Sequence, residues 1–135
     1  MRKKTLGLIM VLFAGFVFGL MPLLKRGCVE GGANNALLLR NLAALGPRAS
    51  RACHFSCALA LVAPDGREFV ALGQCPGTLL HEGRGSNGFG YDPLFLPDGW
   101  DRTFAELPSE TKCTFSHRAR AAERMRPILA ALARA

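Results

Sequence analysis

Residues 53–74, CHFSCALALVAPDGREFVALGQ, decide the fold of this 135-residue chain. Between 53 and 61, large or apolar residues alternate with smaller ones, and this period of two predicts a β-strand. The sequence PDG at 64–66 is typical of a turn, and residues 67–74 then predict a returning strand. We therefore expect an antiparallel β-hairpin, and residues 78–81 are expected to extend this ribbon.

A short helix is expected before the hairpin. Residues 35–45 place three leucines at helical spacing, namely Leu38, Leu42 and Leu45. The asparagine pair at 34–35 can cap the start of this helix, and the Gly-Pro pair at 46–47 ends it.

The chain after the hairpin predicts further elements. Residues 94–96 read as a short buried strand, and 103–107 as one helical turn. A final helix is expected from its cap at Ser116 to about Arg134, with a kink or interruption at Pro127. Its core-facing stripe follows the i, i+3, i+4, i+7 pattern in Met125, Ile128, Leu129 and Leu132. Strands followed by helices predict an α/β or α+β domain with a β-hairpin and flanking helices.

The first 29 residues differ from the rest in composition. An uncharged apolar run spans 5–24, with three basic residues before it and Lys25 and Arg26 after it. About 20 apolar residues can cross the bilayer core as a helix, and a basic start before an apolar stretch is also typical of a secretory signal. We expect an N-terminal hydrophobic helix in a signal- or anchor-like leader (1–29), ahead of a domain at 30–135. Membrane association through 5–24 would follow. The alternative is a leader that is foreign to the domain.

The net charge of +7 is concentrated in this leader. Five of the 17 Lys and Arg residues precede the first acidic residue, Glu30, and from there on 12 bases face 10 acids. A nucleic-acid-binding domain usually carries its positive charge on the folded part, so the sequence disfavours nucleic acid as a partner. The five cysteines contain no Cys-x-x-Cys pair, so we expect buried free thiols rather than a disulfide scaffold or a metal site.

A glycine-rich segment could bind a ligand. It reads GRGSNGFGYDPLF over 83–95, and its glycines let the backbone approach a ligand closely. Phe89 and Tyr91 bracket Gly90, and Pro93 biases Asp92 towards an extended conformation. An aromatic face beside a fixed carboxylate predicts a nucleobase pocket. The alternative is a turn-rich loop whose phenylalanines belong to the core.

A second segment, TFAELPSETKCTFSHR over 103–118, carries polar donors. Ser116, His117 and Arg118 stand at the start of the expected last helix, where anions and acceptors are favoured, and Lys112 lies just upstream. Together the lysine, histidine and arginine could donate to the carbonyl oxygens of an oxidised purine. The alternative is a helix cap followed by a solvated basic face.

In this order and spacing, four motifs resemble the C-terminal half of the inosine/xanthosine triphosphate pyrophosphatase family: GFGYDPLF (88–95), FAEL (104–107), Lys112 and SHR (116–118). The similarity runs from about Asn34 to the C-terminus. It implies an elongated two-lobed α/β fold with a long mixed sheet, usually homodimeric. The family hydrolyses noncanonical purine nucleotides (ITP, dITP, XTP) to the monophosphate and pyrophosphate with Mg²⁺, in the cytoplasm.

The resemblance also implies roles for individual residues. Phe89, with Gly90 and Tyr91 beside it, would stack on the base. The purine edge would be surrounded by Asp92, Lys112, His117 and Arg118, and Ser116 would shape that turn. Donors aimed at a 6-oxo group accept hypoxanthine and disfavour adenine, whose 6-amino group is itself a donor.

The family's phosphate and metal motifs, Ser/Thr-x-Asn-x-x-Lys and Asp-Asp-Ser-Gly, do not occur in this sequence. Before Asp65 the only carboxylate is Glu30, so we assign no catalytic residue and no Mg²⁺ ligand to the chain. Three hypotheses stay open. The chain could be an enzyme completed by a second polypeptide, a non-catalytic remnant that binds a nucleobase, or a membrane-anchored fragment.

Overall fold

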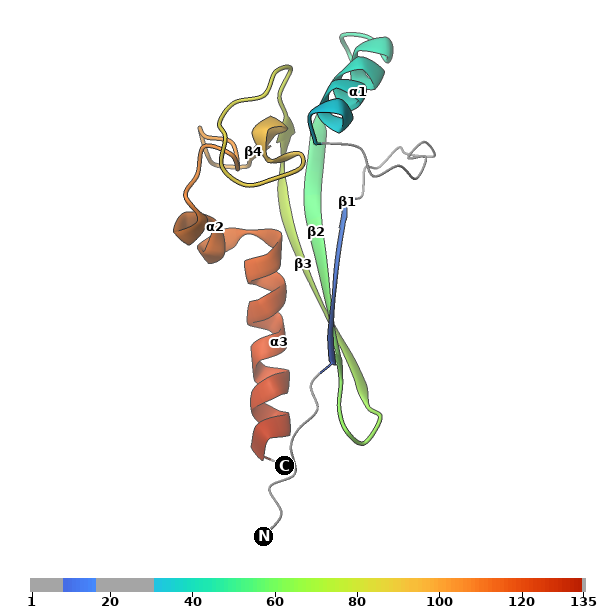
Figure 1. The fold of residues 1–135 in the computed structure, drawn as a ribbon, viewed down its shortest axis with the longest axis vertical. Helices are drawn as coiled ribbons and strands as arrows, with labels where there is room; N and C mark the ends of the chain where they lie inside the picture. Colours follow the sequence, from blue (N-terminus) through green and yellow to red (C-terminus); the bar gives the residue numbers. More distant parts are fainter. Residues whose placement is uncertain (1–8, 17–30, 135) are drawn as a thin grey trace.

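The computed structural model of the chain describes residues 9–16 and 31–134. A long twisted ribbon of β-strands forms its axis, and one helix lies alongside the ribbon over much of its length (Figure 1). The elements in chain order are β1 (Ile9–Phe16), α1 (Gly31–Ala44), β2 (Ala52–Val62), β3 (Glu68–Leu79), the 3₁₀ turn η1 (Asp92–Leu94), β4 (Phe95–Pro97), α2 (Ser109–Phe115) and α3 (His117–Arg134).

The strands form one sheet in the order β1-β2-β3-β4, and each neighbouring pair is antiparallel. β2 and β3 form the expected hairpin, closed where the Ala63 N–H donates to the Arg67 carbonyl at 2.8 Å. The ribbon reaches Leu79, and residues 77–79 pair with β4. The expected hairpin and the α/β class with flanking helices are confirmed, while no parallel pair of the implied mixed sheet occurs among the described strands.

α3 covers one face of the hairpin. The alternate residues of β2 and β3 that face this helix are buried, and they pack with Ala121 and Met125 of α3 in a cluster that also contains Cys57, Leu59, Leu61 and Ala71. At Gly73 the helix comes so close that an added Cβ would collide with the His117 carbonyl and the backbone of Ala121. Glycine is therefore required there for α3 to lie on the sheet.

The expected final helix is present, and Ser116 caps its start. The prediction that Pro127 interrupts this helix is wrong. α3 continues through Pro127 to Arg134. Pro127 lies on the exposed side of the helix, where water can satisfy the carbonyl that its missing N–H leaves free.

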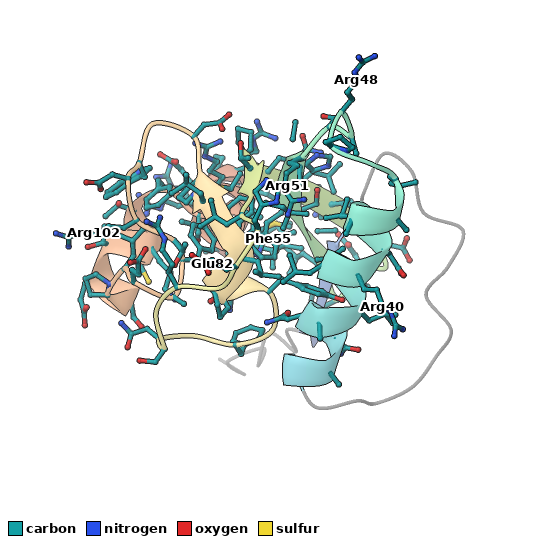
Figure 2. All side chains as sticks on the ribbon, turned by 90° about the horizontal axis from the view of Figure 1, so that it is seen from above. Arg40, Arg48, Arg51, Phe55, Glu82 and Arg102 are labelled. Carbon is teal, nitrogen blue, oxygen red and sulfur yellow. The ribbon has the colours of Figure 1, made fainter. Side chains whose placement is uncertain are left out.

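An aromatic cluster holds the end of the ribbon near η1. Phe95 is fully buried, with its ring centroid 4.4 Å from that of Phe55 and 4.8 Å from that of Phe104. Figure 2 shows Phe55 in the middle of this end of the molecule, whereas Arg48 and Arg102 project outward at its margins. The expected helical turn at 103–107 is present, because the Leu107 N–H donates to the Thr103 carbonyl at 3.1 Å, and it contributes Phe104 and Leu107 to the cluster.

The expected N-terminal hydrophobic helix is wrong where the apolar run is described. Residues Ile9–Phe16 form β1, which runs antiparallel to β2 with Phe16 opposite Phe55. This run is rich in β-branched and aromatic residues that favour strands, and the open edge of β2 offers it hydrogen-bond partners. Residues 5–8 and 17–24 of the run lie outside the described residues. Within the part of the chain that the structure describes, no helix is long and apolar enough to span a bilayer.

Two further expectations need adjustment. α1 begins at Gly31, so the asparagine pair at 34–35 lies inside the helix instead of capping it. Among the free cysteines, Cys57 and Cys75 are buried as expected, but Cys113 is exposed on α2. The domain boundary between residues 29 and 30 stays a prediction.

Candidate functional site

The glycine-rich loop is tied to its surroundings through its backbone. The Arg84 N–H donates to the Pro93 carbonyl at 2.9 Å, and the Asn87 N–H donates to the Ala105 carbonyl at 2.8 Å. Gly88 has a positive φ of 85°, a conformation that favours glycine. These bonds fix the two ends of the segment that presents Phe89; we call residues 88–92 the binding loop.

Asp92 anchors the binding loop from inside. Its side chain is buried, and Oδ2 accepts hydrogen bonds from the Phe89 N–H and from Lys112 Nζ, each at 3.4 Å. Burial raises the pKa of Asp92, and the Lys112 ammonium opposes that rise. A Cβ at Gly88 would collide with this carboxylate. Asp92 and Lys112 therefore act as a partly buried ion pair that shapes the loop.

Phe89 and Arg118 meet at the surface. The Phe89 residue is 68% exposed, and the Arg118 guanidinium carbon lies 5.1 Å from the centroid of its ring. This distance is typical of a cation–π contact. The two candidate segments, far apart in the sequence, are thus brought together at an exposed aromatic face with a guanidinium beside it.

His117 lies behind this surface. It is only 3% exposed, and its ring stacks on Phe55 with centroids 4.9 Å apart. Burial lowers the pKa of His117 to about 4, with a smaller contribution from Arg118, so the imidazole is neutral near pH 7. Its Nδ1 is buried and has no hydrogen-bond partner among the described residues.

The remaining candidates have mainly structural contacts. Ser116 Oγ accepts a hydrogen bond from the Ala119 N–H at 3.2 Å, which makes it the cap of α3. Tyr91 packs against the aromatic cluster and against the leucines that seat α1. The Gly90 carbonyl accepts a hydrogen bond from Asn35 Nδ2 at 3.1 Å. Sequence reasoning missed Asn35 here, because its position before a leucine-rich run suggested only a helix cap.

Two surface hollows in the described region, of about 610 and 350 Å³, lie elsewhere. The larger is lined by the end of α1 with Arg51 and His81, and the smaller by Phe69 and the last turns of α3. Neither of these two hollows is lined by a candidate residue; Phe89 and Arg118 are both exposed at the surface.

The described residues do not fit a magnesium ion. They contain no group of three or more His, Cys, Asp or Glu side chains that could hold a metal. The carboxylate of the site, Asp92, is already engaged by the Lys112 ammonium.

Comparison with known proteins identifies the family. The sequence model of the Ham1 family matches residues 22–128. The chain belongs to the Ham1 family. It is 54% identical over 105 residues to the dITP/XTP pyrophosphatase of Leifsonia xyli, an alignment that covers 78% of this chain and 52% of the relative. For the dITP/XTP pyrophosphatase of Opitutus terrae the identity is 52%, covering 68% of this chain and 45% of the relative.

Solved structures of Ham1 proteins share the fold. The Ham1 protein of Staphylococcus aureus aligns with a TM-score of 0.69 at 33% identity, over 76% of this chain and 52% of that one. The nucleoside-triphosphatase / dITP/XTP pyrophosphatase of Mycobacterium abscessus aligns with a TM-score of 0.67 at 36% identity, over 90% and 66% of the two chains. The resemblance drawn from the motifs is confirmed. The chain spans about half the length of the curated relatives it matches.

Proposed function

We propose that this chain carries the purine-binding part of a nucleoside triphosphate pyrophosphatase that hydrolyses ITP, dITP or XTP to the monophosphate and pyrophosphate. The observation that carries the proposal is the contact between Phe89 and Arg118 at an exposed surface. A flat aromatic face beside a planar donor suits a purine that presents a carbonyl oxygen at its edge.

Recognition would use both side chains in turn. A purine that stacks on Phe89 displaces the Arg118 guanidinium from the ring, at a cost of about 0.5–1 kcal/mol for an exposed cation–π contact. The freed guanidinium then donates to the 6-oxo group of the base. Adenine presents a 6-amino donor at the same place, so the donors of Arg118 would stay unpaired and adenine nucleotides would bind more weakly.

The other residues would support this surface from behind. Asp92 holds the Phe89 backbone through a hydrogen bond while Lys112 balances its charge. Neutral His117 supports the aromatic cluster under Arg118 and does not add a second positive charge beside it. For hydrolysis we propose a requirement for Mg²⁺, with the ion held by groups beyond the described residues of this chain. A homodimer and a cytoplasmic location belong to the same proposal.

Calorimetry with IMP tests the binding part. The wild-type chain should bind IMP at millimolar concentrations or below, and more tightly than AMP. Phe89→Ala should weaken binding about 5- to 150-fold, because stacking of a base on an aromatic ring contributes about 1–3 kcal/mol. Arg118→Ala should weaken it and reduce the preference over AMP. Arg126→Ala, which removes an exposed arginine from the same helix, is the matched control.

Pyrophosphate release from ITP with Mg²⁺ tests the reaction. Release by the chain alone, or after mixing with a polypeptide that carries the phosphate-binding motif, supports the enzyme. IMP binding without release in either assay would reject hydrolysis and leave a nucleobase-binding protein. A folded wild-type chain that binds no IMP at millimolar ligand would reject the whole proposal.

A further inference from the structure

One face of α1 packs against residues at the C-terminal end of the binding loop. Leu38 is buried in a cluster with Leu79 of β3 and Leu94 of η1, and Leu39, Leu42 and Tyr91 pack against that cluster. Asn35 stands one helical turn before Leu38 and Leu39, so it lies on the same face of α1. The leucines thus hold α1 close enough to the loop for the side chain of Asn35 to reach it.

Asn35 makes the direct contact. Its Nδ2 donates to the Gly90 carbonyl at 3.1 Å, a bond between residues 55 positions apart. Its Oδ1 is buried and has no hydrogen-bond partner within the described part of the chain. Among the hydrogen bonds of the described residues, the bond to Gly90 is therefore the one that orients this amide.

The binding loop is consequently held from two sides. On the inner side the Asp92 carboxylate accepts from the Phe89 N–H and from Lys112 of α2. On the other side α1 holds the carbonyl of Gly90, the residue that follows Phe89. The peptide unit that precedes Phe89 and the peptide unit that follows Gly90 are thereby fixed, although the Phe89 ring is largely exposed.

We propose that Asn35 is a positioning residue of the purine site: by holding the Gly90 carbonyl it orients Phe89 for stacking on the base. This inference rests on the proposed function and extends it to α1. Asn35 acts through Phe89 and does not touch the purine. Its loss should weaken IMP binding about three- to fivefold, the size expected for one neutral hydrogen bond.

The test uses the full-length chain and calorimetry with IMP. Asn35→Ala should weaken binding about three- to fivefold. The near-isosteric Asn35→Asp should weaken it further, because a carboxylate oxygen then opposes the Gly90 carbonyl and the pair repels. The matched control is Asn41→Ala, since Asn41 is an exposed asparagine of the same helix; it should bind IMP as the wild type does.

A double-mutant cycle separates positioning from a general structural role. If Asn35 acts through the Phe89 ring, Asn35→Ala should cause no further loss of affinity in a Phe89→Ala background. The same fold loss in both backgrounds, or wild-type affinity in Asn35→Ala, would overturn the inference while the proposed function stands. If the folded wild type and Phe89→Ala both fail to bind IMP, the proposed function fails and this inference falls with it.

Discussion

Two regions of the molecule are built by different means. The hairpin body, formed by β2, β3 and α3, is held by strand pairing and by one stripe of apolar residues from each element. The loop end, residues 80–116, has only short elements. Beyond the aromatic cluster at its base, it is joined by individual hydrogen bonds between distant segments. The Ala105 N–H, for example, donates to the Asp92 carbonyl, and Thr103 Oγ1 donates to the Arg84 carbonyl.

If the proposed purine site is right, most of the strand residues serve stability and most of the loop end serves recognition, with Arg118 of α3 joining the two. The strands of the hairpin body repeat one pattern, and the proposed function uses none of their residues directly; from this body it uses Arg118 at the start of α3. In the loop end each bond fixes a particular backbone atom, and that is what a binding surface needs. Substitutions in the two regions should therefore differ in whether they change folding or ligand affinity.

The largest effect is expected where the two regions share a core. Phe95→Ala should destabilise the protein by about 3–5 kcal/mol, because it empties the centre of the aromatic cluster. Phe89→Ala removes the same side chain from an exposed position, where it contacts the Arg118 guanidinium, and should change the free energy of unfolding by no more than about 1 kcal/mol. Urea unfolding of both variants measures this, and equal midpoints would contradict the assignment of Phe95 to the core.

Gly73→Ala should destabilise the packing of α3 on the hairpin. The new methyl group meets the His117 carbonyl and the backbone of Ala121, so α3 must shift outward at a cost of about 1–3 kcal/mol. Because Arg118 moves with α3, IMP affinity should fall as well. Gly32→Ala is the control, since the added methyl group has open space in α1. A Gly73→Ala variant with the wild-type melting temperature would show that α3 does not lie this close to β3.

Much of the hairpin body could be predicted from the sequence, because its signals are periodic. Alternation over residues 53–61, the PDG turn and the apolar stripe after Ser116 each correspond to an observed element. The apolar run that contains β1 could not be assigned in this way, since a uniformly apolar segment suits a buried strand as well as a helix. The open edge of β2, a tertiary feature, decides its structure.

The loop end was predicted less completely. The motifs placed Phe89 near Arg118, and the structure brings these side chains together. α2 was missed because none of its residues is buried, so it has no apolar face to produce a periodic signal. The contact of Asn35 with Gly90 was missed because a bond between residues so far apart leaves no pattern in the sequence.

The buried His117 predicts a pH dependence of stability. Burial lowers its pKa in the folded protein from 6.5 to about 4, so protonation between these values favours the unfolded state. The stability contributed by the neutral imidazole is complete above pH 6.5 and is lost as the pH falls towards 4. Between pH 7 and pH 5 the wild type should lose about 1–2 kcal/mol, measured by urea unfolding.

His117→Phe isolates this effect. The phenylalanine ring can keep the stacking on Phe55 but does not titrate, so the variant should lose less stability than the wild type over the same pH range. Asp92 acts in the opposite direction, since burial raises its pKa above 3.8 and its contribution falls as the pH rises. It is common to both proteins, so their difference reports on His117. An identical pH profile would contradict a buried neutral imidazole.

The smallest effect is expected at the outer edge of β3, where the hairpin body also uses single polar bonds. β4 pairs only with residues 77–79 of β3. Earlier in β3, the carbonyls of Gln74 and Leu72 accept hydrogen bonds from Arg120 at 2.7 Å and from Arg124 at 2.6 Å. Both bonds are exposed, so the double variant Arg120→Ala/Arg124→Ala should lose only about 1 kcal/mol. An uncovered strand edge can pair with another chain, so light scattering should show concentration-dependent association that Arg126→Ala lacks. Equal scattering by the two variants would mean that these arginines do not protect the edge of β3. Individual polar hydrogen bonds would then matter in the loop end but not in the hairpin body.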